Sequence, residues 1–230
     1  MAILKLNDNY TRPVVLAATG LFLCLAGAYF ISGIELPHKI AYPVLCLALA
    51  GLWVCPWQMC LALVFSAAGD LFGSCGNFIG QMGTFAIGHV LMIFYFIRRY
   101  RAKVEKDGRL TTKAKGFLCM ILFCTLGILA VSFIRIAPEA PSGVIRIGVC
   151  AYSIIISVML ISSMIQRSSL FALGAVLFVF SDFILAWNIF VEAIPNAGLL
   201  IMIPYYLGQW LLFIRSTHFR LTLPLRQFRF

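Results

Sequence analysis

Long apolar stretches separated by short polar turns dominate the chain. A helix that crosses the hydrocarbon core of a bilayer needs about 20 mostly apolar residues. Eight stretches approach or meet this length, and Pro or Gly marks the tightest boundaries between them. The pattern predicts an all-α membrane protein with eight transmembrane helices in one domain, residues 1–230, and a seven-span count is the alternative. We place the spans at about 13–32, 38–56, 59–74, 78–97, 117–134, 144–165, 170–191 and 197–214.

Lysine and arginine fall almost entirely on one side of the predicted membrane. Two precede the first span, eight lie in a predicted loop over 98–116, one follows the sixth span and four follow the eighth, against three on the opposite side. Because cytoplasmic loops carry the excess of Lys and Arg, the N-terminus and the C-terminus are both predicted to be cytoplasmic. The tail over 216–230 mixes basic and aromatic residues and is expected to lie along lipid headgroups.

Composition supports the same class. Hydrophobic residues make up 62% of the chain and charged residues only 11%, where a soluble domain has about 25%. The net charge of +10 could suggest nucleic acid, but the basic residues border apolar stretches and no nucleic-acid motif is present. We expect a multi-pass integral membrane protein, in the cell membrane if the source is bacterial. Membrane lipids are the expected partners, with no nucleic acid and no protein partner indicated.

Two carboxylates lie deep inside predicted spans, where a charged group is costly and marks a functional hypothesis by default. Asp70 comes 11 residues after the start of the third span, and Asp182 comes 12 residues after the start of the seventh. Both spans run outward from the cytoplasm, so at about 1.5 Å per residue both carboxylates lie about 17–18 Å above the cytoplasmic edge. Asp70 and Asp182 are therefore predicted to share a depth near the midplane.

Other polar side chains fall in or near the same band. His89 and Gln209 are predicted about 12 Å above the cytoplasmic edge, and Tyr205 lies one turn higher than Gln209. Each of them could be part of a site or could only hydrogen-bond between helices. Three further candidates for contact with a substrate lie beside Asp182 or near the outer edge: Ser181, Asn188 and Lys39. Lys39 is also explained as an anchor that extends to the membrane surface.

Short motifs on four spans occur in a characteristic order. They are Gly69-Asp70, then Gly83-x-Phe85 with His89, then Phe178-x-x-Ser181-Asp182, and finally Tyr205-Tyr206-x-x-Gln209-x-Leu211. In this order and topology the chain resembles the YhhN-like family of eight-span membrane proteins from about Lys39 to Ser216. It departs from the family where Lys-Pro is common near the second span, because His38-Lys39-Ile40 stands here.

The resemblance implies a lysoplasmalogenase-like hydrolase, which cleaves the vinyl ether bond of a lysophospholipid into a fatty aldehyde and a glycerophospho-alcohol. Such a bond is activated by protonation at carbon, after which water attacks the oxocarbenium-like product. A protonated and an ionised carboxyl group suit this chemistry. Asp70 and Asp182 would then be the acid/base pair, His89 would relay protons, and Tyr205 and Gln209 would orient water or substrate.

Two other functions remain open at this point: another lysophospholipid hydrolase, or a small proton-coupled transporter that uses the same aspartates. We predict no cofactor. A metal bound by the two aspartates and His89 is also not predicted, because no helix carries ligands at a suitable spacing. The eight cysteines lie mostly in apolar stretches and are expected to pack there.

Overall fold

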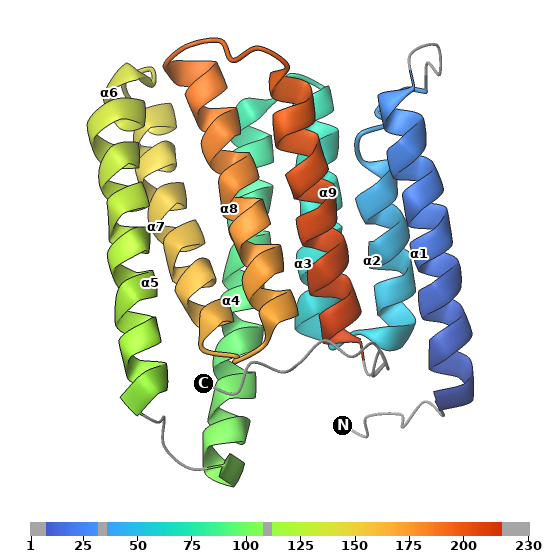
Figure 1. The fold of residues 1–230 in the computed structure, drawn as a ribbon. Coiled ribbons are helices and arrows are strands. Elements are labelled where there is room, and N and C mark those ends of the chain that lie inside the picture. Colours follow the sequence, from blue (N-terminus) through green and yellow to red (C-terminus); the bar gives the residue numbers. More distant parts are fainter. Residues whose placement is uncertain (1–7, 32–35, 108–111, 218–230) are drawn as a thin grey trace.

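The computed structural model describes residues 8–31, 36–107 and 112–217, and it shows a helical bundle (Figure 1). All regular structure in these ranges is helical. The elements are α1 (Asp8–Phe30), α2 (Tyr42–Val54), α3 (Trp57–Ser74), α4 (Phe78–Asp107), α5 (Thr112–Val131), the π-helix η1 (Ser132–Ile136), α6 (Ala137–Glu139), α7 (Val144–Met164), α8 (Ser169–Phe190) and α9 (Ala197–Ser216).

Each predicted span coincides with a helix, and α1 begins at the same end of the bundle at which α9 ends (Figure 1). Six described helices are long and apolar enough to cross a membrane: α1, α4, α5 with its extension through Glu139, α7, α8 and α9. The protein is thus a multi-pass integral membrane protein. The remaining two long helices are α2, with 13 residues, and α3, which carries Asp70. That they also cross, and that the termini are cytoplasmic, stay predictions.

Both boundaries of the polar loop predicted over 98–116 are wrong. Helix α4 continues through Asp107 and α5 already begins at Thr112, which leaves only residues 108–111 between them. Lysine and arginine are good helix formers, so a basic segment can extend a helix into water without interrupting it. The predicted headgroup-binding tail lies outside the described residues from 218 onward.

The outer surface of the bundle is apolar. Phe123 is 79% exposed, Ile134 is 70% exposed and Trp53 is 68% exposed. Side chains of this size would be costly to expose to water, whereas the hydrocarbon core of a bilayer solvates them. The exposed surface therefore agrees with the membrane setting that the composition indicated.

A tight turn orients the two helices that carry Asp70 and His89. The chain reverses between α3 and α4 through Gly76, whose φ of +73° lies in the left-handed region that favours glycine. The side-chain oxygen of Asn77 then accepts a hydrogen bond of 2.9 Å from the backbone N–H of Gly80 and caps the start of α4. The two polar residues consequently lie on adjacent antiparallel helices.

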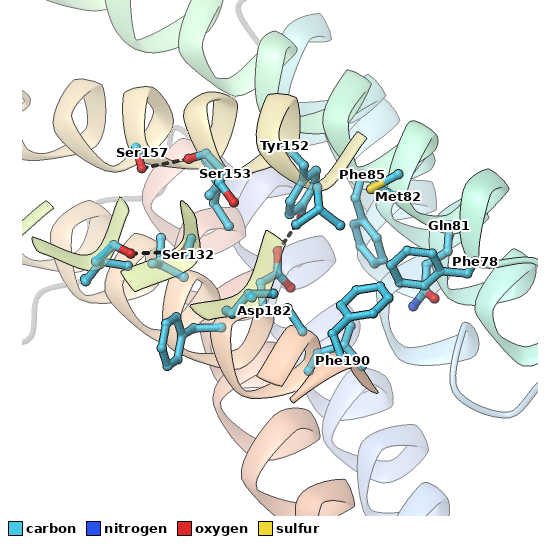
Figure 2. Close-up of a pocket in the computed structure, with 18 residues that line it drawn as sticks. Phe78, Gln81, Met82, Phe85, Ser132, Tyr152, Ser153, Ser157, Asp182 and Phe190 are labelled. Carbon is cyan, nitrogen blue, oxygen red and sulfur yellow. Dashed lines mark hydrogen bonds between the residues drawn. The ribbon is translucent and has the colours of Figure 1, made fainter. Parts of the chain in front are cut away.

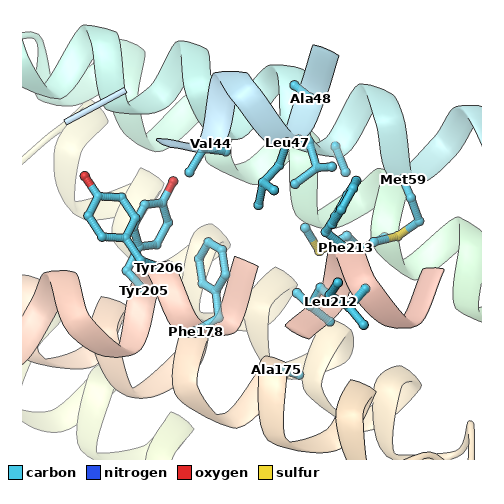
Figure 3. Close-up of a cluster of buried hydrophobic side chains, with 14 of the residues drawn as sticks. Val44, Leu47, Ala48, Met59, Ala175, Phe178, Tyr205, Tyr206, Leu212 and Phe213 are labelled. Carbon is cyan, nitrogen blue, oxygen red and sulfur yellow. The ribbon is translucent and has the colours of Figure 1, made fainter. Parts of the chain in front are cut away.

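Helices α8 and α9 pack against each other at two glycines. A Cβ on Gly208 would lie 2.8 Å from the carbonyl oxygen of Gly174, and a Cβ on Gly174 would lie 3.1 Å from the carbonyl oxygen of Gly208. Small residues allow such close contact of backbones in membrane bundles. The same contact places Phe178 of α8 beside Tyr205 of α9 in the buried core (Figure 3).

We expect Gly208→Ala to lower the free energy of unfolding by about 1–3 kcal/mol, because the added methyl group meets backbone that cannot move away. The matched control is Gly198→Ala on the same helix, where nothing lies within 4 Å of the new Cβ. There the substitution should be neutral or stabilise the helix by up to about 1 kcal/mol. Thermal unfolding in detergent measures both, and equal melting temperatures would contradict the packing argument.

Candidate active site

Tyr152 on α7 links a carboxyl group and an imidazole. Its hydroxyl donates a hydrogen bond to Oδ2 of Asp182 on α8 and lies 3.0 Å from Nε2 of His89 on α4. Nε2 of His89 is itself 3.8 Å from Oδ2 of Asp182. Because the tyrosine hydroxyl donates to Oδ2 of Asp182, the tyrosine oxygen can accept a hydrogen bond from Nε2 of His89 in the tautomer that carries a proton there. Three helices thus bring an acid, an imidazole and a hydroxyl group together.

A second carboxyl–tyrosine pair lies nearby. The hydroxyl of Tyr205 on α9 donates a hydrogen bond of 2.8 Å to Oδ2 of Asp70 on α3. Both side chains are buried, with 3% of each residue exposed. Asp182 is close enough to act electrostatically on Asp70. The two carboxyl groups predicted at one depth therefore belong to one electrostatically connected region.

Aromatic rings connect the two pairs. The ring of Phe178 lies 4.6 Å from the His89 ring and 5.3 Å from the Tyr205 ring, both edge to face. Phe85 on α4 lies 6.1 Å from Phe178 and 5.9 Å from Tyr205. Edge-to-face contacts of this kind favour one defined arrangement of rings. They also cover the buried carboxyl group of Asp70, and electrostatic interactions are stronger where water is excluded.

A cavity of about 70 Å³ opens beside the first pair (Figure 2). Asp182 and Tyr152 form part of its wall, and residues of α4, α5, η1, α7 and α8 form the rest. The π-helix contributes Ser132 and Ile136 to this wall; π-helical turns of this type are frequent at functional sites. Polar side chains in the wall are Gln81, Ser132, Tyr152, Ser153, Ser157 and Asp182.

The predicted site residues differ in how close they lie to this cavity. Asp182 lines it, and His89 lies directly behind Tyr152. Asp70 and Tyr205 do not line it, and they connect to it through Phe178 and Phe85. The cavity therefore gives a substrate direct access to one of the two aspartates.

Ser181 and Asn188 have structural partners away from the cavity wall. The Ser181 hydroxyl donates a hydrogen bond of 2.9 Å to the carbonyl oxygen of Ile201, which ties α8 to α9. The side-chain oxygen of Asn188 accepts one of 2.9 Å from the backbone N–H of Ile194, in the connection between these helices. Neither residue lines the cavity, so their predicted contact with a substrate has no support in this geometry.

Lys39 and Gln209 differ in what surrounds them. The Lys39 amine lies 5.8 Å from the ring centre of Tyr29, near the end of the bundle at which α2 begins, and it does not line the cavity. Gln209 is fully buried one turn after Tyr205, and neither atom of its amide has a hydrogen-bond partner among the described residues. Burial without partners costs free energy. A purely interhelical hydrogen bond, which the sequence left open for Gln209, is therefore not its role here.

Tyr152 is the residue that the sequence analysis missed. It stands eight residues into α7 from the end opposite to the chain termini, about 12 Å along the helix. In a core about 30 Å thick this is the level predicted for Asp70 and Asp182. The depth calculation that selected the aspartates would thus have selected Tyr152, had its hydroxyl been counted as polar within an apolar stretch.

Metal ligands do not gather at this site. Over residues 8–31, 36–107 and 112–217, no three His, Cys, Asp or Glu side chains converge as ligands of one ion would. Asp182 and His89 face each other across the Tyr152 hydroxyl, an arrangement that suits proton transfer.

The model of the YhhN family matches residues 38–216, a range that contains both carboxyl–tyrosine pairs and His89. The chain belongs to the YhhN family. Its relatives include the lysoplasmalogenase TMEM86B of Rattus norvegicus, 33% identical over 74% of this chain and 68% of the relative, and that of Homo sapiens, 32% identical over 74% and 70%. The Mus musculus protein of the same name is 35% identical over 76% of this chain and 72% of its own length. No solved structure matches the chain.

The relatives of this chain are named lysoplasmalogenases. In this YhhN protein the cavity beside Asp182 lies between helices that span the membrane. The site is therefore placed where a lipid can reach it without leaving the bilayer.

Removal of the Tyr205 hydroxyl should destabilise the bundle. Tyr205→Phe takes a hydrogen-bond donor from the buried carboxyl group of Asp70, and we expect a loss of about 1–3 kcal/mol in the free energy of unfolding. Tyr42→Phe is the matched control, because the Tyr42 hydroxyl bonds the carbonyl oxygen of Pro37 at an exposed position. Thermal unfolding of both variants is the measurement, and a Tyr205→Phe protein as stable as wild type would contradict the role given to this bond.

Proposed function

We propose that this protein hydrolyses the vinyl ether bond of a lysoplasmalogen within the membrane and releases a fatty aldehyde and a glycerophospho-alcohol. The observation that carries the proposal is the position of Asp182 in the wall of a membrane-embedded cavity, hydrogen-bonded by Tyr152 and 3.8 Å from His89. The lysoplasmalogenases among its relatives support the choice of reaction.

The reaction needs an acid that reaches carbon. In our proposal a carboxyl proton passes to the alkenyl carbon that is not bound to oxygen, and the positive charge is shared by the other carbon and the ether oxygen. Water adds to that carbon and loses a proton, which gives a hemiacetal. The hemiacetal then breaks its bond to the ether oxygen, leaving an aldehyde and an alcohol. The carboxyl group recovers its proton, so the cycle balances.

The geometry suggests different tasks for the two aspartates. Asp182 lines the cavity and is placed to exchange a proton with the substrate, and Tyr152 with His89 is placed to return that proton. Two carboxyl groups in one poorly solvated region do not readily ionise together. Asp70, hydrogen-bonded by Tyr205 and away from the cavity wall, would act on the reaction through its electrostatic interaction with Asp182.

Cleavage of an ester is less well supported by the same cavity. A serine nucleophile needs a base within hydrogen-bond reach. The hydroxyls of Ser132 and Ser157 instead donate to carbonyl oxygens of their own helices, at 3.0 Å and 2.7 Å. The Nε2 atom of His89 is occupied by Tyr152. The arrangement favours acid chemistry on a vinyl ether over acyl transfer.

The direct test uses purified protein in lipid vesicles with a lysoplasmenyl-ethanolamine substrate and, separately, with its ester-linked analogue. We expect mass spectrometry to detect fatty aldehyde from the vinyl ether and no fatty acid from the ester. Fatty acid from the ester alone would replace the proposal with acyl hydrolysis. Absence of both products would contradict hydrolysis of either lipid and would favour proton-coupled transport.

Asp182→Asn and Asp70→Asn should each lower the rate of aldehyde release by about 10²–10⁴-fold, because each removes one member of the acid/base pair. Glu192→Gln is the control: Glu192 lies in the α8–α9 connection, where its carboxylate accepts a hydrogen bond of 3.2 Å from Trp187. Melting temperatures close to wild type would show that the variants fold. Full activity in either aspartate variant would remove that residue from the pair.

A further inference from the structure

A second cavity adjoins the first along α5, α7 and α8. Its volume is about 730 Å³, and Ile128, Val179 and Phe183 line both cavities. These shared residues form the boundary between a chamber that contains Asp182 and one that does not. The two chambers therefore adjoin each other, and Asp182 lies in the wall of the first one.

Polarity changes sharply across this boundary. Six polar side chains line the first cavity, whereas Thr125 is the one hydroxyl-bearing side chain in the wall of the second. The Thr125 hydroxyl donates a hydrogen bond of 2.8 Å to the carbonyl oxygen of Ile121 in its own helix. The second cavity thus offers a ligand almost exclusively hydrocarbon surface.

The two adjoining cavities follow each other along the direction of the helix axes. On α8 the second cavity begins at Val176, six residues before Asp182, and the first reaches Phe190, eight residues after it. At 1.5 Å per residue these intervals are about 9 Å and about 12 Å. Figure 2 shows Ser157 and Ser132 on one side of Asp182, with Phe190, Phe78 and Gln81 on the other. Asp182 therefore lies between the apolar second cavity and the end of the first cavity that carries Gln81 (Figure 2).

We propose that the apolar cavity holds the hydrocarbon chain of a single-chain ether lipid, with the headgroup in the first cavity near Gln81 and the reacting bond beside Asp182. This inference rests on the proposed function. It predicts that Met120, Cys124 and Met164 limit the length of chain that fits. It also orients the lipid, with the headgroup toward the end of the bundle opposite to the start of α1 and the end of α9.

A hydrocarbon chain fits this cavity better than a segment of protein would. Every N–H and C=O group of an inserted peptide would need a hydrogen-bond partner in a membrane interior, and the wall provides almost none. An alkyl chain has no such groups and needs no hydrogen-bond partner there. The wall that this cavity shares with the chamber of Asp182 then assigns the occupant to the same molecule that reacts there.

A substitution in the cavity tests chain selection. Cys124→Trp should fill the space beside Ile128, and we expect the ratio of kcat/KM for a long-chain over a short-chain vinyl ether substrate to fall at least tenfold. Phe123→Trp is the matched control, because Phe123 is adjacent in α5, is 79% exposed and lines neither cavity. An unchanged ratio in Cys124→Trp would overturn the proposal.

A binding measurement separates this inference from the proposed reaction. The wild-type chain has free thiols at Cys124, in the cavity wall, and at Cys119, outside it, and both are exposed on α5. A saturated alkyl ether lysophospholipid, which has no vinyl ether to cleave, should slow alkylation of Cys124 by N-ethylmaleimide several-fold and leave Cys119 unchanged. Peptide mass spectrometry reads both sites.

The outcomes distinguish two kinds of failure. Protection of Cys124 in a protein that releases no aldehyde would support the chain site while the proposed reaction fails. Aldehyde release without protection of Cys124, or with equal protection of Cys119, would overturn the chain site and leave the reaction standing. If the Cys124→Trp variant does not fold, the alkylation experiment on the wild-type protein decides whether the chain site exists.

Discussion

A carboxyl group inside a membrane protein must find hydrogen-bond donors within the protein, because hydrocarbon supplies none. Both deep aspartates of this chain meet that requirement with a tyrosine from another helix. A tyrosine hydroxyl reaches across an interhelical gap on a rigid ring, so each bond also fixes the distance between two helices. The helices α3 and α9, and α7 and α8, are joined in this way, and these bonds hold the polar side chains of the candidate site in place.

The close contact of α8 with α9 serves the same region. Gly174 and Gly208 let the two backbones approach until no side chain fits between them. Phe178 then meets Tyr205 at 5.3 Å, and the edge of its ring faces His89 on the other side of the cluster. The direct backbone contact at Gly174 and Gly208 thus positions the aromatic contacts that lie one helical turn away. The polar groups stay in fixed relation because the rings between them have little room to move.

The helices and the two aspartates could be predicted from sequence because bilayer thickness ties residue number to depth. Asp70 and Asp182 were found by counting residues from helix ends, and the same count placed His89 near them. Depth alone gives no direction around a helix axis. For this reason Ser181 and Asn188, at plausible levels, turned out to hydrogen-bond α9 and a connecting segment instead of lining the cavity. Tyr152 was missed for a different reason. A tyrosine within an apolar stretch is counted as one more apolar residue, so its hydroxyl group was not considered. The extension of α4 was missed because charge marks the membrane edge and says little about where a helix ends.

The adjoining cavities have a consequence for how a divided molecule would leave. A lipid cut beside Asp182 yields one fragment that dissolves in hydrocarbon and one that dissolves in water. The apolar chamber lies on one side of the cut, and the end of the first cavity that carries Gln81 lies on the other (Figure 2). Each fragment would already occupy the compartment that leads to its own solvent, so departure of one would not have to wait for the other. The boundary at Ile128, Val179 and Phe183 would then also separate the exit path of the hydrocarbon-soluble fragment from that of the water-soluble fragment.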